Sequence, residues 1–247
     1  MYTYEFCFYT KSDLNEEEFL YSLQNYMSSL ILNGQILEEY QNLVKYKDHF
    51  KCRFVIPERK ALNSFSNNNY DEKFRKKLTE FLVEEIKCIE IGINADVDRA
   101  CECEKSEYYI LSGDNDYAVS PILCGNCNKS IPLYKLPKTY ENSDYYDILN
   151  WQKTYKAYDS LFMNSYSERH AYKMINSIDS KMVKEGRRIC AFIQEVTKIP
   201  VYYFLFKYYK KNSNTCPGCG EYWVFHQKDG IYSHVCHTCK LISKDIV

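Results

Sequence analysis

The 247-residue sequence lacks two features that would place it in or beyond a membrane. It contains no apolar run that approaches the length of a membrane-spanning helix. Its first residues, Met1 to Glu5, show no charged region followed by an apolar stretch, which is how a secretory signal peptide begins. We therefore expect a cytoplasmic protein whose twelve cysteines are reduced or bind metal and do not form disulfides.

Common catalytic motifs are absent as well. The sequence has no G-x-x-x-x-G-K-[ST] segment for nucleotide phosphates and no H-E-x-x-H segment for a catalytic metal. His49 and His170 have no carboxylate or nucleophile at a recognisable spacing. These absences predict that the protein is not an enzyme and has no catalytic residues.

The strongest chemical signal is a pair of C-x-x-C motifs near the C-terminus. Two such pairs at this separation are typical of a zinc site, because each pair lies on a tight turn and four thiolates complete a tetrahedron around the ion. Gly220 follows the first pair and supplies the positive φ that such a turn commonly needs. The predicted ligands are Cys216, Cys219, Cys236 and Cys239.

A second cysteine set occurs upstream, at Cys101, Cys103, Cys124 and Cys127. Its first half is C-x-C, which departs from the usual spacing. For both sets the alternatives are a redox C-x-x-C motif or a disulfide. We expect two structural zinc ions, and four cysteines at each site leave no open position for catalysis.

Charge is distributed unevenly along the chain, although the net charge is only −1. Residues 1–150 contain 17 basic and 25 acidic residues, a balance of −8, whereas residues 151–211 contain 12 and 5, a balance of +7. A polyanion site is therefore expected on the basic segment. The alternative is that these lysines form ordinary solvated helix faces.

The hydrophobic patterns predict an α+β protein whose first domain, residues 1–95, has the β-α-β-β-α-β order of a ferredoxin-like fold. Ser12 or Asp13 is the expected cap of its first helix, and Asn33-Gly34 is the expected end. Many unrelated functions use this fold, so it carries little functional information. The expected elements are a strand at 2–9, a helix to 32, strands at 36–45 and 49–56, a helix at 70–86 and a strand at 88–93.

Three further segments follow. We expect residues 96–138 to form a zinc-ribbon-like hairpin that needs its metal to fold. Residues 139–211 are expected to form a helical domain, and residues 212–247 are expected to form a C-terminal zinc ribbon. Gly186 interrupts the helical pattern, where we expect another backbone to approach closely. The apolar run 201–206 fits either a buried strand or a short helix.

The C-terminal third carries a resemblance to a known family. The resemblance lies in Gly186-Arg187-Arg188-Ile189, then Glu195, then Pro200-Val201-Tyr202-Tyr203, then Cys216-Pro217-Gly218-Cys219-Gly220 and Trp223. The sequence resembles a family of bacterial proteins of unknown function, DUF2310-like. That family is described as zinc-ribbon-containing, with a conjectured role in nucleic-acid binding. The resemblance implies a metal-binding ribbon and does not name a ligand.

The first functional hypothesis is a zinc-ribbon binding module for nucleic acid, acting through residues 151–247. A stacking surface is expected at Trp223, Phe225 or Tyr232. The alternatives are that Trp223 and Phe225 dock the ribbon on the helices and that Arg187 and Arg188 form salt bridges with Glu185 or Glu195. The candidate nucleic-acid contacts are Arg187, Arg188, Lys207, Lys210, Lys211 and Trp223.

The second hypothesis is a protein-interaction role, such as an immunity protein or antitoxin that inhibits a toxin or nuclease. Its motive is the −8 charge of residues 1–150, which would steer association with a basic partner. The alternative is that this acidic surface only keeps the protein soluble. No membrane partner is expected.

Overall fold

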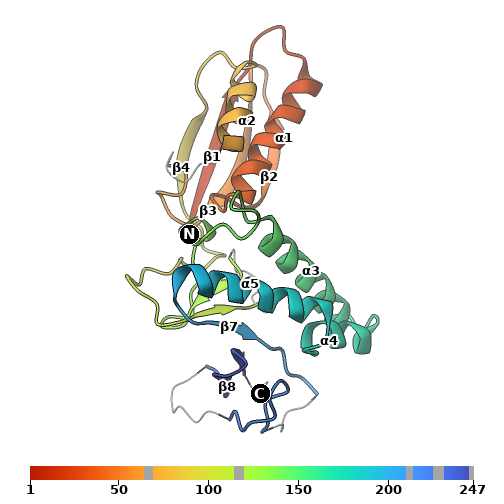
Figure 1. Cartoon of the computed structure of the whole chain (residues 1–247). Helices are drawn as coiled ribbons and strands as arrows, with labels where there is room; N and C mark the ends of the chain where they lie inside the picture. Colours follow the sequence, from red (N-terminus) through yellow and green to blue (C-terminus); the bar gives the residue numbers. More distant parts are fainter. Residues whose placement is uncertain (64–68, 114–119, 210–213, 225–230, 245–247) are drawn as a thin grey trace. The chain divides into compact units, whose positions relative to one another are not determined.

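The computed structural model describes residues 1–63, 69–113, 120–209, 214–224 and 231–244 (Figure 1). The chain divides into two compact units. The first contains Met1–Ala100, Tyr117–Ser120 and Pro132–Tyr145; the second contains Cys101–Asp116, Pro121–Ile131 and Tyr146–Val247. The predicted segment 1–95 thus belongs to the first unit, while both cysteine sets and most of the predicted helical segment belong to the second.

The first unit is a four-stranded antiparallel sheet with two helices. Its elements, in chain order, are β1 (Tyr2–Tyr9), α1 (Glu16–Leu32), β2 (Leu37–Lys45), β3 (His49–Ile56), α2 (Asn69–Thr79) and β4 (Lys87–Ile93). The strand order β2-β3-β1-β4, with every neighbouring pair antiparallel, is that of the split β-α-β arrangement expected from the sequence. Figure 1 shows α1 and α2 side by side against this sheet.

The core of this unit follows the hydrophobic periods of its sequence. Alternate residues of β1 and β3, such as Phe8 and Phe54, are buried against the apolar stripe of α1, which includes Phe19. The cap of α1 is Asn15, whose side chain accepts from the Glu18 amide at 3.5 Å, so the expected cap at Ser12 or Asp13 is wrong. The expected end at Asn33-Gly34 is confirmed, with Gly34 at φ +67°.

The second helix is shorter than its pattern predicts. α2 ends at Thr79, before the apolar residues Phe81, Leu82 and Ile86. The reason is a competing interaction with the end of β1: Leu82 forms a bridge with Thr10, and the Val83 amide donates to the Tyr9 carbonyl at 3.0 Å. A 3₁₀ turn, η2 (Leu133–Lys135), also belongs to this unit.

In its described residues, the second unit contains three helices and a five-stranded sheet. The helices are α3 (Tyr146–Met163), α4 (Glu168–Asn176) and α5 (Lys181–Thr197). The sheet order is β6-β5-β7-β9-β8, formed by β5 (Tyr109–Leu111), β6 (Ile122–Cys124), β7 (Val201–Phe204), β8 (His234–Cys236) and β9 (Leu241–Ser243). The apolar run at 201–206 therefore begins as a buried strand, which decides between the two alternatives.

β7 is the central strand of this sheet. Both hairpins, β5 with β6 and β8 with β9, are antiparallel, whereas β7 runs parallel to β5 on one side and to β9 on the other. The register pairs Tyr109 with Val201 and Tyr203 with Leu241. The two cysteine-bearing hairpins thus belong to one sheet, joined through β7.

Gly186 allows α5 to pack closely on this sheet. A Cβ at this position would lie 2.3 Å from Cε2 of Tyr203 and 2.8 Å from Nε1 of Trp151. Both neighbours are side chains, so the expectation that another backbone approaches Gly186 is wrong.

None of the helices in the described part of the chain combines the length and apolar character that a membrane span requires.

Candidate metal centres

The C-terminal cysteines form a compact cluster. The sulfur atoms of Cys216, Cys219, Cys236 and Cys239 all lie within 4.8 Å of one another, and Sγ of Cys219 is 3.6 Å from Sγ of Cys236. A tetrahedral ion with metal–sulfur distances of about 2.3 Å separates its ligand atoms by about 3.8 Å. The four thiols therefore have the spacing that one tetrahedral metal ion requires.

Backbone amides surround the sulfur atoms of this cluster. The Gly218 amide lies 3.4 Å from Sγ of Cys216, and the Cys239 amide lies 3.3 Å from Sγ of Cys236. Burial by itself would raise the pKa of Cys216, but N–H groups of Cys219 and Gly218 outweigh it, and the pKa falls below its usual range. Gly220, at φ +76°, completes the turn as expected.

The upstream cysteines form an equivalent cluster. Cys101, Cys103, Cys124 and Cys127 also place their sulfur atoms within 4.8 Å of one another, with Sγ of Cys127 3.5 Å from Sγ of Cys101. The C-x-C half fits this geometry: its Cys103 amide lies 3.4 Å from Sγ of Cys101. All twelve cysteines lie in the described part of the chain, and every one is a free thiol.

The environment of Cys124 favours its thiolate. Burial by itself would raise the pKa, but the Ser106 hydroxyl, 3.1 Å from Sγ, and the amides of Cys127 and Asn126 stabilise the anion. Together they lower the pKa of Cys124 to about 7. Metal binding requires deprotonated sulfur, so Cys124 is ready to bind at neutral pH, whereas burial raises the pKa of Cys101 and the hydrogen bond with Cys127 raises that of Cys103.

The other four cysteines lie outside both clusters. Cys7, Cys52 and Cys190 are buried, and burial raises the pKa of Cys52 to about 12. Cys88 is exposed.

Tyr202 of β7 connects the two turns that carry the clusters. Its hydroxyl lies 2.7 Å from Nδ1 of His237, which is in the last C-x-x-C motif. Its ring makes an edge contact with Tyr108, whose own ring packs on Gly125 of the upstream motif. Tyr202 of the shared sheet thus contacts one residue next to each set of cysteines, His237 through its hydroxyl and Tyr108 through its ring.

The basic face of α5 lines a cavity beside the C-terminal cluster. This cavity of about 370 Å³ is lined by Lys184, Arg187 and Arg188 of α5 and by Thr238, Cys239 and Lys240 of the C-terminal segment. Nη2 of Arg187 lies 3.4 Å from the Cys239 carbonyl oxygen. We call this the basic groove. Sequence reasoning missed Lys184 and Lys240, although the helical spacing of 184, 187 and 188 was a usable signal.

The candidate nucleic-acid contacts are placed differently from one another. Arg188 forms ion pairs with Asp147 at 2.6 Å and with Glu185 at 2.8 Å, so its charge is partly neutralised. The pair with Glu185 is one of the salt bridges that the sequence offered as an alternative to phosphate contact. Lys207 and Trp223 are buried, at 5% and 2% exposure, and Nζ of Lys207 lies 5.4 Å from the centre of the Trp223 ring. Because both are buried, neither Lys207 nor Trp223 can be a surface contact for nucleic acid, which corrects that expectation.

The remaining candidates are Lys210, Lys211, Phe225 and Tyr232. Lys210, Lys211 and Phe225 lie outside the described residues, and the Tyr232 hydroxyl donates to Oδ1 of Asn128 at 2.6 Å.

Comparison with known proteins now identifies the family. Residues 103–206 match the model of a domain of unknown function, DUF2310, and residues 1–92 match a second domain of unknown function, DUF8589. An uncharacterized protein from Haemophilus influenzae is 30% identical over 210 residues, which cover 78% of this chain and 77% of that protein. The chain belongs to the DUF2310 family. A second uncharacterized Haemophilus influenzae protein is 30% identical over 162 residues, covering 62% of this chain and 78% of that protein.

The DUF2310 match includes three of the upstream cysteines, Cys103, Cys124 and Cys127, and all of α3 to β7. It ends at residue 206, before the C-terminal cluster. The domain model therefore covers α5 and the central strand, while the second cysteine set lies beyond the matched residues.

Two solved structures also match, each over 38% of this chain. One is named "Putative antibiotic biosynthesis monooxygenase from Nitrosomonas europaea" (15% identity, 98% of that chain, TM-score 0.32), and the other is an antibiotic biosynthesis monooxygenase (15% identity, 99% of that chain, TM-score 0.29). Because both carry the name of an enzyme, the expectation that this protein is not an enzyme is contradicted. At these TM-scores the likeness assigns no activity to this DUF2310 protein.

Proposed function

We propose that this protein holds two structural zinc ions, and that the second unit uses the basic groove to bind the phosphate backbone of a nucleic acid. The observation that carries the binding proposal is the position of Arg187, between the face of α5 and the carbonyl of Cys239 in the C-terminal metal turn. The turn that carries Cys236 and Cys239 would form one wall of the groove once it holds its metal ion. Helix α5 would form the other wall.

Zinc is the metal that fits the donor set best. Both clusters offer four thiolates at tetrahedral spacing, and soft sulfur ligands favour zinc over the hard cations magnesium and calcium. Each hairpin is short, with strands of three residues, so it buries little apolar surface of its own. A structural metal would supply the missing stability, worth on the order of 10 kcal/mol in isolated zinc fingers.

The charge of the groove supports a polyanionic ligand. In the described part of the chain, no carboxylate forms an ion pair with Arg187 or Lys240. Arg188 keeps half of its side chain exposed beside its two acidic partners, and Lys184 lies 4.0 Å from exposed Asp179. Cations that lack buried acidic partners are available to bind phosphate oxygens. When they neutralise the phosphates, the nucleic acid releases its condensed counterions.

The test is a titration of fluorescein-labelled single-stranded RNA, single-stranded DNA and duplex DNA with zinc-loaded protein, followed by fluorescence anisotropy at several salt concentrations. The double variant R187Q/K240Q removes two cations from the groove, and K173Q removes one exposed lysine of α4 outside it. Each lost phosphate contact reduces the slope of log K against log salt by roughly 0.7 to 0.9. We expect a slope reduced by about 1.5 for the double variant and an unchanged slope for K173Q.

Two results would overturn the binding proposal. The first is no salt-sensitive binding of any of the three nucleic acids by the zinc-loaded protein at low ionic strength. The second is a salt slope that K173Q reduces by about half as much as the double variant, the proportion expected when every removed cation counts equally, which would indicate diffuse attraction to the basic second unit and no role for the groove.

A further inference from the structure

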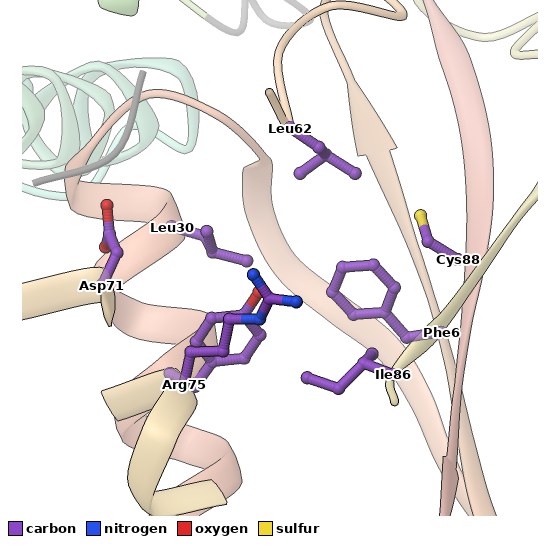
Figure 2. A pocket seen from close by; sticks show the side chains of 8 residues that line it. Phe6, Leu30, Leu62, Asp71, Arg75, Ile86 and Cys88 are labelled. Atoms are coloured by element: carbon purple, nitrogen blue, oxygen red, sulfur yellow. The ribbon is translucent and has the colours of Figure 1, made fainter. Parts of the chain in front are cut away.

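The first unit contains a separate cavity on the helix side of its sheet. Its volume is about 150 Å³, and Phe6, Leu30, Leu62 and Ile86 supply apolar walls. Figure 2 shows these side chains around a common space, with the Cys88 sulfur at the β4 side. A volume of about this size is enough for a molecule as large as benzene.

One cation lies in this cavity. The Arg75 side chain extends from α2, and Figure 2 shows its guanidinium directed toward the space between Leu30, Leu62 and Phe6. The Asp71 carboxylate also lines the cavity, and its Oδ2 accepts a hydrogen bond from Nδ2 of Asn33 at 2.7 Å. Among the described residues, no carboxylate forms an ion pair with Arg75.

The cavity is accessible from solvent. Arg75 and Cys88 are both exposed, whereas Phe6 and Leu30 are buried at 3% exposure. A cavity with apolar side chains along part of its wall and one guanidinium fits a ligand that has an apolar body and an anionic end. A planar guanidinium binds a carboxylate or a phosphate with two parallel hydrogen bonds, and the carboxylate is the smaller of the two groups.

We infer that this cavity binds a small apolar carboxylate of about the size of benzoate. The ring or branched chain of the ligand lies against Phe6, Leu30 and Ile86, and its carboxylate pairs with the Arg75 guanidinium. The site is independent of the basic groove, because none of the residues that line the groove belongs to the first unit.

The probe is sodium benzoate, titrated into the full-length, zinc-loaded protein with ¹³C-labelled methyl groups. We expect saturable binding with a dissociation constant on the order of 1 mM or below. Nuclear Overhauser effects should connect the ring protons of benzoate to methyl groups of Leu30, Leu62 and Ile86. The absence of saturable binding, or contacts with methyl groups elsewhere in the protein, would overturn the inference.

Two variants separate the roles of charge and space. R75Q should weaken benzoate at least about tenfold, because a charge-assisted hydrogen bond is lost, and should leave neutral benzyl alcohol unchanged. I86F should fill the cavity and weaken both ligands. K76Q, which removes the next exposed cation of α2, should change neither. Equal benzoate affinity in R75Q and the unmodified protein would overturn the assignment of Arg75.

Discussion

The hydroxyl of Tyr202 lies 2.7 Å from Nδ1 of His237, so the central strand of the second unit is bonded to the turn that carries the last two cysteines. Tyr202 is only 6% exposed, and its ring also contacts Tyr108. A single side chain of β7 thus contributes to the surroundings of both cysteine clusters. The stability of each centre should therefore depend on β7.

Replacing Tyr202 with Phe should loosen the C-terminal metal. The substitution keeps the ring but removes the bond to His237, a loss of about 0.5 to 1.5 kcal/mol. Metal release to a chromophoric chelator should be faster than from the unmodified protein. Tyr222→Phe is the matched control, because Tyr222 is 67% exposed in the same ribbon. Equal release rates for the two variants would contradict the role given to Tyr202.

Removal of the C-terminal metal should loosen β7 as well as its own hairpin. The amides of Tyr203 and Leu205 donate to carbonyls of Lys240 and Ile242, both at 2.8 Å. In Cys219→Ser, hydrogen exchange at these two amides should accelerate by about tenfold or more, since local opening sets their protection. Cys88→Ser, outside both clusters, should leave them unchanged. Acceleration confined to residues 231–244 would show that the hairpin is independent of β7.

Gly186→Ala should destabilise the second unit. Alanine favours the helix by about 1 kcal/mol over glycine. The added Cβ would lie 2.3 Å from Cε2 of Tyr203, and overpacking of this kind typically costs about 1 to 3 kcal/mol. Denaturant unfolding should show a net loss of stability, whereas Lys184→Ala, at an exposed position of α5, should change stability little. A stabilised Gly186→Ala would mean that the packing against Tyr203 is loose.

Glu90 should titrate far below the usual range of a glutamate side chain. Two hydrogen bonds from Arg59 and one from the Tyr4 hydroxyl hold its pKa at about 2, below its usual value of 4.5. A depressed pKa in the folded state means that the pair stabilises the fold above about pH 4.5 and that this contribution is lost as the pH falls toward 2. Carboxyl NMR titration should show this pKa, and Arg59→Gln should raise it. A Glu90 pKa near 4.5 in the unmodified protein would contradict the observed pairing.

The parts of the fold that follow local periods were predictable. Alternation predicted β3, the apolar stripe predicted α1, and the close pairs of cysteines, three C-x-x-C and one C-x-C, predicted both sets of four cysteines that the structure brings together. A local sequence pattern does not predict which distant segments of the chain pair with each other. The early end of α2 depends on the bridge from Leu82 to Thr10, and the junction of the two hairpins depends on parallel pairing through β7.

The basic groove was predictable only in part. The charge count placed it on the segment that includes α5, but charge alone does not distinguish exposed from buried lysines. Lys207 is buried near His234, whereas Lys240 reaches the groove only because the metal turn lies beside α5. Tertiary packing decides both positions.

The metal content of the full-length protein tests the central claim most directly. We predict two zinc ions per chain by elemental mass spectrometry, and one in each of the variants Cys103→Ser and Cys219→Ser. These variants remove one ligand from each cluster, whereas Cys88→Ser should retain both ions. Fewer than two ions in the unmodified protein, or loss of both from a single substitution, would contradict an architecture with two separate metal centres in one sheet.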